Sequence, residues 1–477
     1  MMRRCGLMLS VSLLLVTLSS YGIAQNVAPG PGDPKELQSF VDSLIKAEMA
    51  KERIPGAAFV FVKDGRVVMI RGYGLANVES FTPVVPESTI FRIGSISKVF
   101  TATAVVQLAD RGLVDMNADV NKYLKKLHVP DGFGAPVTVE QLLDHTAGFD
   151  EIRPGTQAGN AESVMPLAEF LGPRLVRVRA PGRTISYSTY GVTLAGEMIE
   201  EITGHSFEDH LRREIWSPLG MSRTNVTIPA SLQSSVATGY ELANGALVPA
   251  AWEWYHTTPA SSVNSTAADM GKFMIAQLQL GRLGDTRIMS ARAATYMQRQ
   301  HVTMHPLIPG FALGFYEDYV GSLRVIEHGG QVAGFSSQMV LIPEDNAGFF
   351  VVSQFENGHL RDELKDGLLR RYYPKARMRL TVPAPRAGIA ERATQYAGRY
   401  APITSCHSCI PRSVPMVLAV TAGPDGSLSI AGNRWIEIAP DLFVRHDGSG
   451  YLYFRRDSTG KVVEMFPGSF WSFERLP

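Results

Sequence analysis

The 477-residue chain has almost no net charge and, after its first residues, no long apolar run. Its 46 Lys and Arg residues nearly cancel its 45 Asp and Glu residues, so the net charge of +1 gives no reason to expect a nucleic acid as a partner. No later segment is long and apolar enough to span a bilayer, and no stable membrane insertion is therefore expected. The composition, 45% hydrophobic and 19% charged, is typical of a globular chain with two or three domains.

Cysteine is also scarce, with three residues in the whole chain. Cys5 falls in an N-terminal leader, which leaves Cys406 and Cys409 in the stretch CHSC. Such close neighbours can pair in an oxidising compartment, whereas a zinc site needs four ligands and only His407 is available locally. A local disulfide or two unpaired thiols are both favoured over a metal or redox site, and no cofactor is expected.

The first 24 residues are typical of an export signal. Arg3 and Arg4 supply the positive end, residues 7–18 supply the apolar stretch, and GIA forms a small-residue cleavage site. A membrane anchor would need a longer unbroken apolar run. We therefore expect a cleaved signal peptide over residues 1–24 and a periplasmic or secreted protein.

Residues 34–375 carry helical patterns between extended ones. Apolar spacing predicts a helix over Pro34–Arg53, and the turn pair Asp64-Gly65 predicts an antiparallel hairpin after it. Strands flanking a helical region predict an α+β domain in which distant segments close one antiparallel sheet. Further helices are expected over residues 97–111, from 138 onward, 190–202, 207–215 and 266–280, with capping boxes at Thr138/Gln141 and Thr266/Asp269, and strands at 324–326 and 336–354.

The composition changes to Pro, Ala and Gly near residues 376–388, which predicts a linker. From residue 389 to residue 477, short alternating runs separated by Asp-Gly, Asn and Ser-Gly turns predict an all-β, barrel-like domain. This segment contains no candidate nucleophile with a base at motif spacing. We therefore expect it to modulate access to a site elsewhere rather than the chemistry.

The stretch FRIGSISKVF places Ser95 where a helix is expected to begin and Lys98 one turn later on the same face. Backbone N–H groups are free at a helix start, and the helix dipole favours negative charge there. Another S-x-x-K match, Ser43 to Lys46, lies in the middle of the first expected helix, where its amide is already bonded. The context favours Ser95 as a nucleophile beside an amine, with a buried structural lysine as the alternative.

Two further stretches can complete a site around Ser95. SYSTYG places Tyr187 just ahead of an expected helix, and EHGGQVAGFSS places His328, Gly329 and Gly330 at the edge of a strand, where glycines let a substrate backbone approach. Taken alone, Tyr187 is more often a core tyrosine and His328 a turn residue. Their order and separation favour a joint catalytic role.

With these motifs the sequence resembles the serine β-lactamase and penicillin-binding protein superfamily. The nearest branch contains class C β-lactamases, D-alanyl-D-alanine carboxypeptidases, D-aminopeptidases and β-lactamase-like esterases. The resemblance covers about residues 34–373 and includes IPGAAFVFVKDGRVV, LLDHTAGF and SSVNSTAADMGKFM. It implies a β-lactamase/transpeptidase-like fold, an antiparallel sheet with a helical insertion.

The resemblance also implies roles for the motif residues. Ser95 is the nucleophile, Lys98 its proton acceptor, and Tyr187 the catalytic base and acid. A serine hydroxyl needs a base to become a good nucleophile, and a Lys98 ammonium is expected to keep the pKa of Tyr187 low. Water activated by Tyr187 then clears the acyl-enzyme.

The third motif of the family supplies the substrate-binding side. The resemblance implies that His328, Gly329 and Gly330 form this motif. It further implies that the backbone N–H groups of Ser95 and Gln331 form the oxyanion hole, which stabilises the developing negative charge.

Two departures from the family pattern bear on the substrate. The tyrosine motif usually ends in asparagine but here ends in Thr189, and the third motif of true β-lactamases begins with lysine but here begins with His328. The Glu-x-x-Leu-Asn stretch of class A enzymes and the G-x-S-x-G pentapeptide of α/β-hydrolases are absent.

The sequence therefore predicts an exported serine hydrolase that cleaves an ester or a D-amino-acid amide in a small-molecule or peptide substrate. We expect esterase or D,D-peptidase activity with at most weak β-lactamase activity. The alternatives are a dedicated class C-like β-lactamase and a penicillin-recognising sensor that acylates without turnover.

Overall fold

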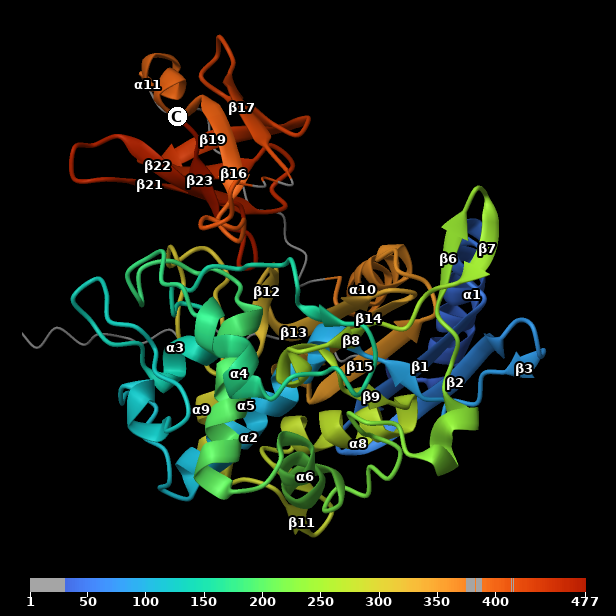
Figure 1. The fold of residues 1–477 in the computed structure, drawn as a ribbon. Helices are drawn as coiled ribbons and strands as arrows, with labels where there is room; N and C mark the ends of the chain where they lie inside the picture. The colour runs from blue at the N-terminus through green and yellow to red at the C-terminus, as the bar shows by residue number, and fades with distance from the viewer. Residues whose placement is uncertain (1–30, 375–381, 383–387, 413, 415) are drawn as a thin grey trace, which may run out of the picture.

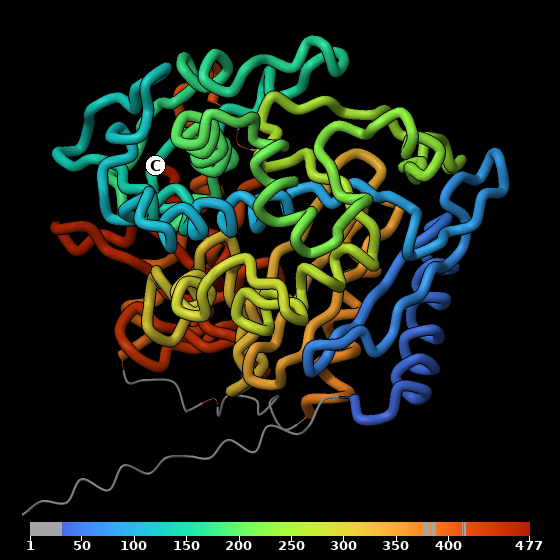
Figure 2. Tube along the Cα trace, turned by 90° about the horizontal axis from the view of Figure 1, so that it is seen from below, coloured from blue at the N-terminus to red at the C-terminus, as the bar shows by residue number. Residues whose placement is uncertain are grey.

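The computed structural model describes residues 31–374, 382, 388–412, 414 and 416–477 (Figure 1). The signal peptide expected at residues 1–24 and most of the linker expected at residues 376–388 lie outside the described residues. The described chain forms a large domain of helices and strands with a β-barrel of C-terminal residues beside it (Figure 1). Within the large domain, the blue N-terminal strands and the orange strands lie side by side in both views (Figure 1, Figure 2).

One antiparallel sheet of seven strands, in the order β12-β13-β14-β15-β1-β2-β3, forms the centre of the large domain. The expected closure by distant segments is confirmed, because Ala57 of β1 lies opposite Ser353 of β15. The expected hairpin is confirmed as well, since Asp64 and Gly65 have φ angles of 51° and 74°. The strands are β1 Gly56–Lys63, β2 Arg66–Asn77, β3 Thr82–Pro83, β12 Tyr316–Val320, β13 Leu323–Val332, β14 Phe335–Ile342 and β15 Ala347–Ser353.

Strand β1 buries its side chains in two separate cores. Successive side chains of a strand point to opposite faces, so a strand covered on both sides is apolar at nearly every position. Phe59 and Phe61 join the core beneath α1 and α10, which are Pro34–Glu52 and His359–Tyr372. Val60 joins the opposite core, to which the helices inserted between β3 and β12 contribute.

The helical insertion between β3 and β12 is confirmed. Its helices are α2 Ser97–Asp110, α3 Val139–Leu143, α4 Leu167–Leu171, α5 Thr189–Thr203, α6 Phe207–Leu211, α7 Thr258–Ser261, α8 Ala267–Leu278 and α9 Ala291–Gln298. Its short paired strands are β4 Phe91–Arg92 with β9 Asn264–Ser265, β5 Gln157–Ala158 with β8 Trp254–Tyr255, β6 Tyr240–Ala243 with β7 Ala246–Pro249, and β10 Arg282–Leu283 with β11 Thr286–Arg287.

The two predicted capping boxes have different outcomes. At α3, Thr138 and Gln141 exchange both hydrogen bonds, so this box is confirmed. At α8, Thr266 accepts from the backbone N–H of Asp269, but the Asp269 carboxylate accepts from Arg223 instead of returning to Thr266. The prediction of a second complete box is therefore wrong, and aspartate, one methylene shorter than glutamate, accounts for the difference.

The C-terminal segment folds as a closed barrel of eight strands, which confirms the expected barrel-like domain. It is not all-β, because it opens with a helix, α11 (Ile389–Tyr396). Ile389, Ala393 and Tyr396 of this helix pack into the barrel core. The strands are β16 Gly398–Pro402, β17 Leu418–Ala422, β18 Leu428–Ile430, β19 Asn433–Ala439, β20 Leu442–Arg445, β21 Tyr451–Arg456, β22 Val462–Phe466 and β23 Phe473–Arg475.

Between β16 and β17, Cys406 and Cys409 form a disulfide with Cα atoms 5.6 Å apart, which decides between the two alternatives left by the sequence. We refer to residues 406–409 as the CHSC turn. Within the described residues, no helix is long and apolar enough to cross a membrane. The same residues include no group of three or more His, Cys, Asp or Glu side chains arranged to hold a metal ion.

Candidate active site

Ser95 and Lys98 lie together at the start of α2. Ser95 sits in a single 3-10 turn, η1 (Gly94–Ile96), and its side chain is partly exposed. Lys98 is 1% exposed, and its Nζ donates hydrogen bonds to Ser95 Oγ, 3.1 Å away, and to the carbonyl oxygen of Ala260, 2.9 Å away. Ser95 is thus partly exposed, while the neighbouring amine is buried and held in place.

Burial gives Lys98 a low pKa. Removing an ammonium from water disfavours its charged form, so the pKa of Lys98 falls from 10.5 to about 7. The Glu151 carboxylate opposes this fall, and the Arg153 guanidinium adds to it. Part of the Lys98 population is therefore neutral at neutral pH. A neutral amine at this position can accept the hydroxyl proton of Ser95.

Tyr187 lies in the loop before α5, close to both Lys98 and His145. Lys98 Nζ is 4.8 Å from the centre of the Tyr187 ring, and the His145 ring is 4.5 Å from the same ring. Ser188 caps α5, and its backbone N–H donates to His145 Nδ1 at 3.0 Å. The helix cap and His145 together fix the position of the tyrosine.

The expectation of a low pKa for Tyr187 is wrong. Burial raises the pKa of Tyr187 well above 10 because a phenolate is poorly solvated there, and the hydrogen bond with Ser95 offsets only part of the rise. Lys98, whose own pKa is low, supplies too little positive charge to reverse the shift. At neutral pH Tyr187 can donate a proton, and Lys98 is the better proton acceptor.

The third motif lies in strand β13, packed against η1. Strand β12 pairs with β13 only as far as Glu327, whereas β14 pairs with β13 from Ile326 to Val332 and so along the whole motif. A methyl group at Gly330 would lie 1.9 Å from the carbonyl oxygen of Ile93, and one at Gly94 would lie 2.8 Å from the backbone nitrogen of Gln331. These close approaches bring the η1 turn and the Gln331 backbone together, as an oxyanion hole made of two amides requires.

Gly330→Ala is therefore expected to damage both stability and turnover. The added methyl group would overlap Ile93 O, so the backbone must move at the cost of about 1–3 kcal/mol of unfolding free energy. We expect ester turnover to fall at least about tenfold, because a misplaced donor weakens oxyanion stabilisation. Gly159→Ala is the matched control, since a methyl group there has no neighbour within 4 Å. Thermal melting and kcat/KM measure the two effects, and wild-type values for Gly330→Ala would contradict the close approach.

His328 is buried and uncharged. It is 1% exposed, and its Nδ1 lies 2.7 Å from the carbonyl oxygen of Gly329. Burial, and then the charge of Lys98, lower the pKa of His328 to about 3. A neutral imidazole supplies no full positive charge to attract a substrate carboxylate, whereas the lysine of true β-lactamases does.

A buried carboxylate that the sequence analysis missed lies beside Thr189. Glu151 is 9% exposed, and its two oxygens accept from the backbone N–H of Thr189 at 3.1 and 3.0 Å. Burial raises the pKa of Glu151, while Thr189 and the charge of Lys98 oppose the rise. Glu151 closely follows the family-like stretch LLDHTAGF, and this proximity could have identified it as a candidate site residue. No sequence motif pointed to Ala260, whose carbonyl oxygen binds Lys98.

The sequence matches the family model described as Beta-lactamase over residues 41–372. It is 30% identical over 347 residues to unguisins hydrolase ungD' of Aspergillus campestris and 25% identical over 328 residues to protein flp of Staphylococcus aureus. These alignments cover 68% of this chain and 62% and 64% of the two relatives, so the chain spans slightly less than two thirds of their length.

Two solved structures are similar in fold. SurE is 22% identical with a TM-score of 0.67, covering 93% of this chain and 100% of that one. The octameric penicillin-binding protein homologue from Pyrococcus abyssi is 23% identical with a TM-score of 0.61, covering 91% and 99%. Identities this low show the fold alone. Because the family match spans most of the large domain, the chain belongs to the β-lactamase family, whose members are generally serine hydrolases.

Proposed function

We propose that this protein is an exported serine hydrolase that cleaves an ester or a D-amino-acid amide through an acyl-enzyme on Ser95. The observation that carries the proposal is the 3.1 Å contact between Ser95 Oγ and the buried amine of Lys98. Its substrate is a small molecule or a peptide, and its activity is of the esterase or D,D-peptidase type. The predicted signal peptide directs it to the periplasm or the cell exterior.

In the proposed mechanism, the neutral amine of Lys98 takes the hydroxyl proton of Ser95 as Oγ bonds to the substrate carbonyl carbon. The carbonyl oxygen becomes negative, and the N–H groups of Ser95 and Gln331 stabilise it. As the intermediate collapses, Tyr187 donates its proton to the departing oxygen or nitrogen, and the Lys98 ammonium reprotonates Tyr187. Water then attacks the acyl ester, its proton passes to the same pair, and Ser95 regains its hydroxyl.

Two features weigh against a dedicated class C-like β-lactamase. The neutral His328 cannot supply the charge that a β-lactam carboxylate would meet. Thr189 offers one side-chain donor, whereas the family asparagine offers two donors and one acceptor for the amine and the substrate amide. At most weak β-lactamase activity is therefore proposed.

The sensor alternative rests on Thr189, since a poorly held acyl-enzyme could persist. A single net hydrogen bond is worth about 0.5–1.5 kcal/mol, so its loss slows a reaction about tenfold or less. That is too little to stop turnover. The relative that is 30% identical is itself described as a hydrolase, which further favours turnover over sensing.

A parallel turnover assay on a short acyl ester, a chromogenic cephalosporin and a D-Ala-D-Ala peptide distinguishes the three candidate functions: esterase or D,D-peptidase, β-lactamase, and sensor. We expect rapid cleavage of the ester or the peptide and a poor cephalosporin rate. Preferential cephalosporin hydrolysis would instead support the β-lactamase. An adduct that accumulates by mass spectrometry without product would support the sensor.

Thr189→Asn is expected to change the substrate preference. It should raise kcat/KM for penicillins or acyl-D-Ala-D-Ala peptides by about tenfold or less, because the amide can hold an acylamido carbonyl. Simple esters lack that group and should be nearly unaffected. Thr227→Asn, at an exposed threonine, is the matched control. If Thr189→Asn folds but the ratio of kcat/KM for penicillins or peptides to kcat/KM for simple esters is unchanged, Thr189 does not occupy the position of the family asparagine.

A further inference from the structure

The C-terminal barrel contacts the loop that carries Tyr187. Arg455 of β21 donates from Nη1 to the carbonyl oxygen of Arg183 at 2.6 Å. Glu464 of β22 accepts from the Thr184 hydroxyl at 3.4 Å. Both contacts lie a few residues before the tyrosine, so the barrel is fixed to the base of this loop.

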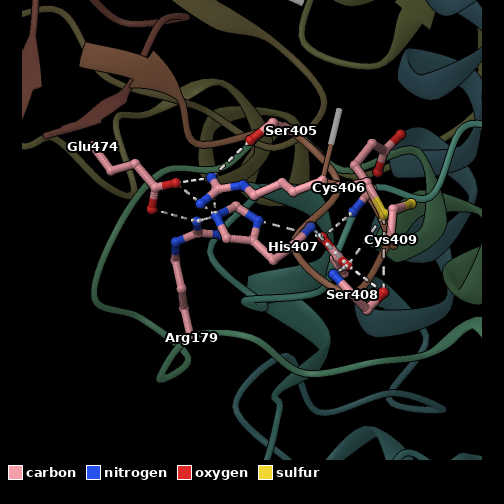
Figure 3. Close-up of polar contacts among 10 residues, drawn as sticks. Arg179, Ser405, Cys406, His407, Ser408, Cys409 and Glu474 are labelled. Atoms are coloured by element: carbon pink, nitrogen blue, oxygen red, sulfur yellow. Dashed lines mark hydrogen bonds and ion pairs between the residues drawn. A yellow bond between two sulfur atoms is a disulfide. The ribbon is translucent and has the colours of Figure 1, made fainter. Parts of the chain in front are cut away.

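The CHSC turn of the barrel holds a second segment next to the site. Its backbone N–H groups at His407 and Ser408 each donate to the Asp150 carboxylate at 2.8 Å, and the Ser408 hydroxyl donates at 2.7 Å. Burial alone would raise the pKa of Asp150, but these hydrogen bonds lower it and keep the group ionised. His407 also contacts Glu474 at 2.8 Å, and Glu474 pairs with Arg179 at 3.3 Å (Figure 3).

A third contact brings an aromatic side chain of the barrel onto the candidate site. The loop between β22 and β23, residues 467–472, is anchored where the Ser469 hydroxyl donates to the carbonyl oxygen of Glu317 at 2.8 Å. The next residue, Phe470, has its ring 4.9 Å from the Tyr187 ring and 5.5 Å from the Tyr316 ring. Three separate contacts thus hold this ring against the tyrosine.

Beside these rings lies a cavity of about 250 Å³, lined in part by Tyr316, Phe470 and Trp471. Its acidic lining residues are neutralised by ion pairs, Arg324 with Glu317, and Lys365 with both Asp318 and Glu327. The wall next to Tyr187 is therefore aromatic, and the charges behind it are already paired.

We propose that Phe470 is a specificity-determining residue and that loop 467–472 of the barrel forms the wall of the leaving-group subsite. The inference rests on the proposed function, because a proton from Tyr187 can reach the departing atom only if the leaving group lies beside Tyr187, and hence against Phe470. An aromatic wall stabilises an apolar or aromatic leaving group by ring contact. The cations behind this wall, Arg324 and Lys365, are already paired with its carboxylates, so a carboxylate on the leaving group would lose water there without gaining a partner from the wall. The subsite thus takes an uncharged aromatic or apolar leaving group, which within the proposed function favours esters over D-Ala-D-Ala peptides, because the departing D-Ala carries a carboxylate.

Two acetate esters that differ only in the leaving group measure this preference, methyl 4-acetoxybenzoate and its free acid, 4-acetoxybenzoate. Wild type is expected to favour the uncharged ester. Phe470→Ala should lower the ratio of their kcat/KM values about three- to tenfold, the scale of one aromatic pair. Phe470→Lys should lower the ratio further, because an ammonium attracts the carboxylate. Labelling of Ser95 by a fluorophosphonate, whose leaving group is fluoride, should change less than twofold in Phe470→Ala.

The matched control is Phe81→Ala, at a phenylalanine that is 78% exposed beside β3. Thermal melting shows whether each variant folds, and Phe470→Leu replaces Phe470→Ala if the latter does not. An unchanged ratio in a folded Phe470 variant that is still labelled would overturn the inference. So would a labelled wild type that hydrolyses neither ester or prefers the charged one. A wild type that is neither labelled nor active would instead overturn the proposed function.

Discussion

Ser95→Ala is expected to abolish covalent labelling by a fluorophosphonate or a penicillin and to lower ester turnover by at least about a thousandfold. Ser95 is partly exposed at a helix start, and its Oγ lies 3.1 Å from the amine of Lys98. Alanine removes the atom that forms the acyl bond, so the remaining groups have nothing to activate. Intact-protein mass spectrometry detects the adduct, and initial rates on a short acyl ester measure the turnover.

Ser43→Ala is the matched control for this result. Ser43 and Lys46 repeat the S-x-x-K spacing, but they lie in the middle of α1 on an exposed face. Its labelling and turnover should equal those of wild type. An adduct that persists in folded Ser95→Ala would remove Ser95 as the nucleophile.

The ester kcat/KM should rise with pH through an apparent pKa near 7. Burial lowers the pKa of Lys98 to about 7, and the amine can accept the Ser95 proton only when it is neutral. Below that pH the lysine is protonated and activity falls, and above it activity reaches a plateau, because burial keeps Tyr187 protonated to much higher pH. A pH profile of kcat/KM from pH 5 to pH 9 measures the midpoint.

Lys98→Arg is expected to lower turnover about 10²–10⁴-fold and to remove this midpoint, since a guanidinium does not deprotonate in this range. Lys46→Arg, on the exposed face of α1, should leave the profile unchanged. The charged or titratable groups that affect Lys98 or are affected by it are Glu151, Arg153, His145 and His328. The same midpoint in Lys98→Arg would assign the titration to a carboxyl or imidazole group instead of Lys98.

Much of the fold could be predicted from the sequence because the responsible interactions are local. Asp64-Gly65 sets a hairpin through its own backbone angles, and Thr138 with Gln141 sets a helix start within four residues. The same reasoning fails where a side chain has a distant partner. Asp269 is an example, because its carboxylate binds Arg223 rather than completing a local cap.

The sequence by itself determined the sheet with its helical insertion and the barrel, since spacing and periodicity record local backbone geometry. The family and the roles expected of the motif residues came from the resemblance of the motifs. Only the tertiary structure decided which groups surround those motifs. Burial, not a neighbouring charge, sets the proton affinities of Lys98 and Tyr187, and burial depends on segments far away in the chain. Phe470 is distant from Tyr187 in sequence, yet their rings lie 4.9 Å apart. Such contacts arise from the packing of one domain on another, and this packing produces no repeating residue pattern in the sequence of either segment.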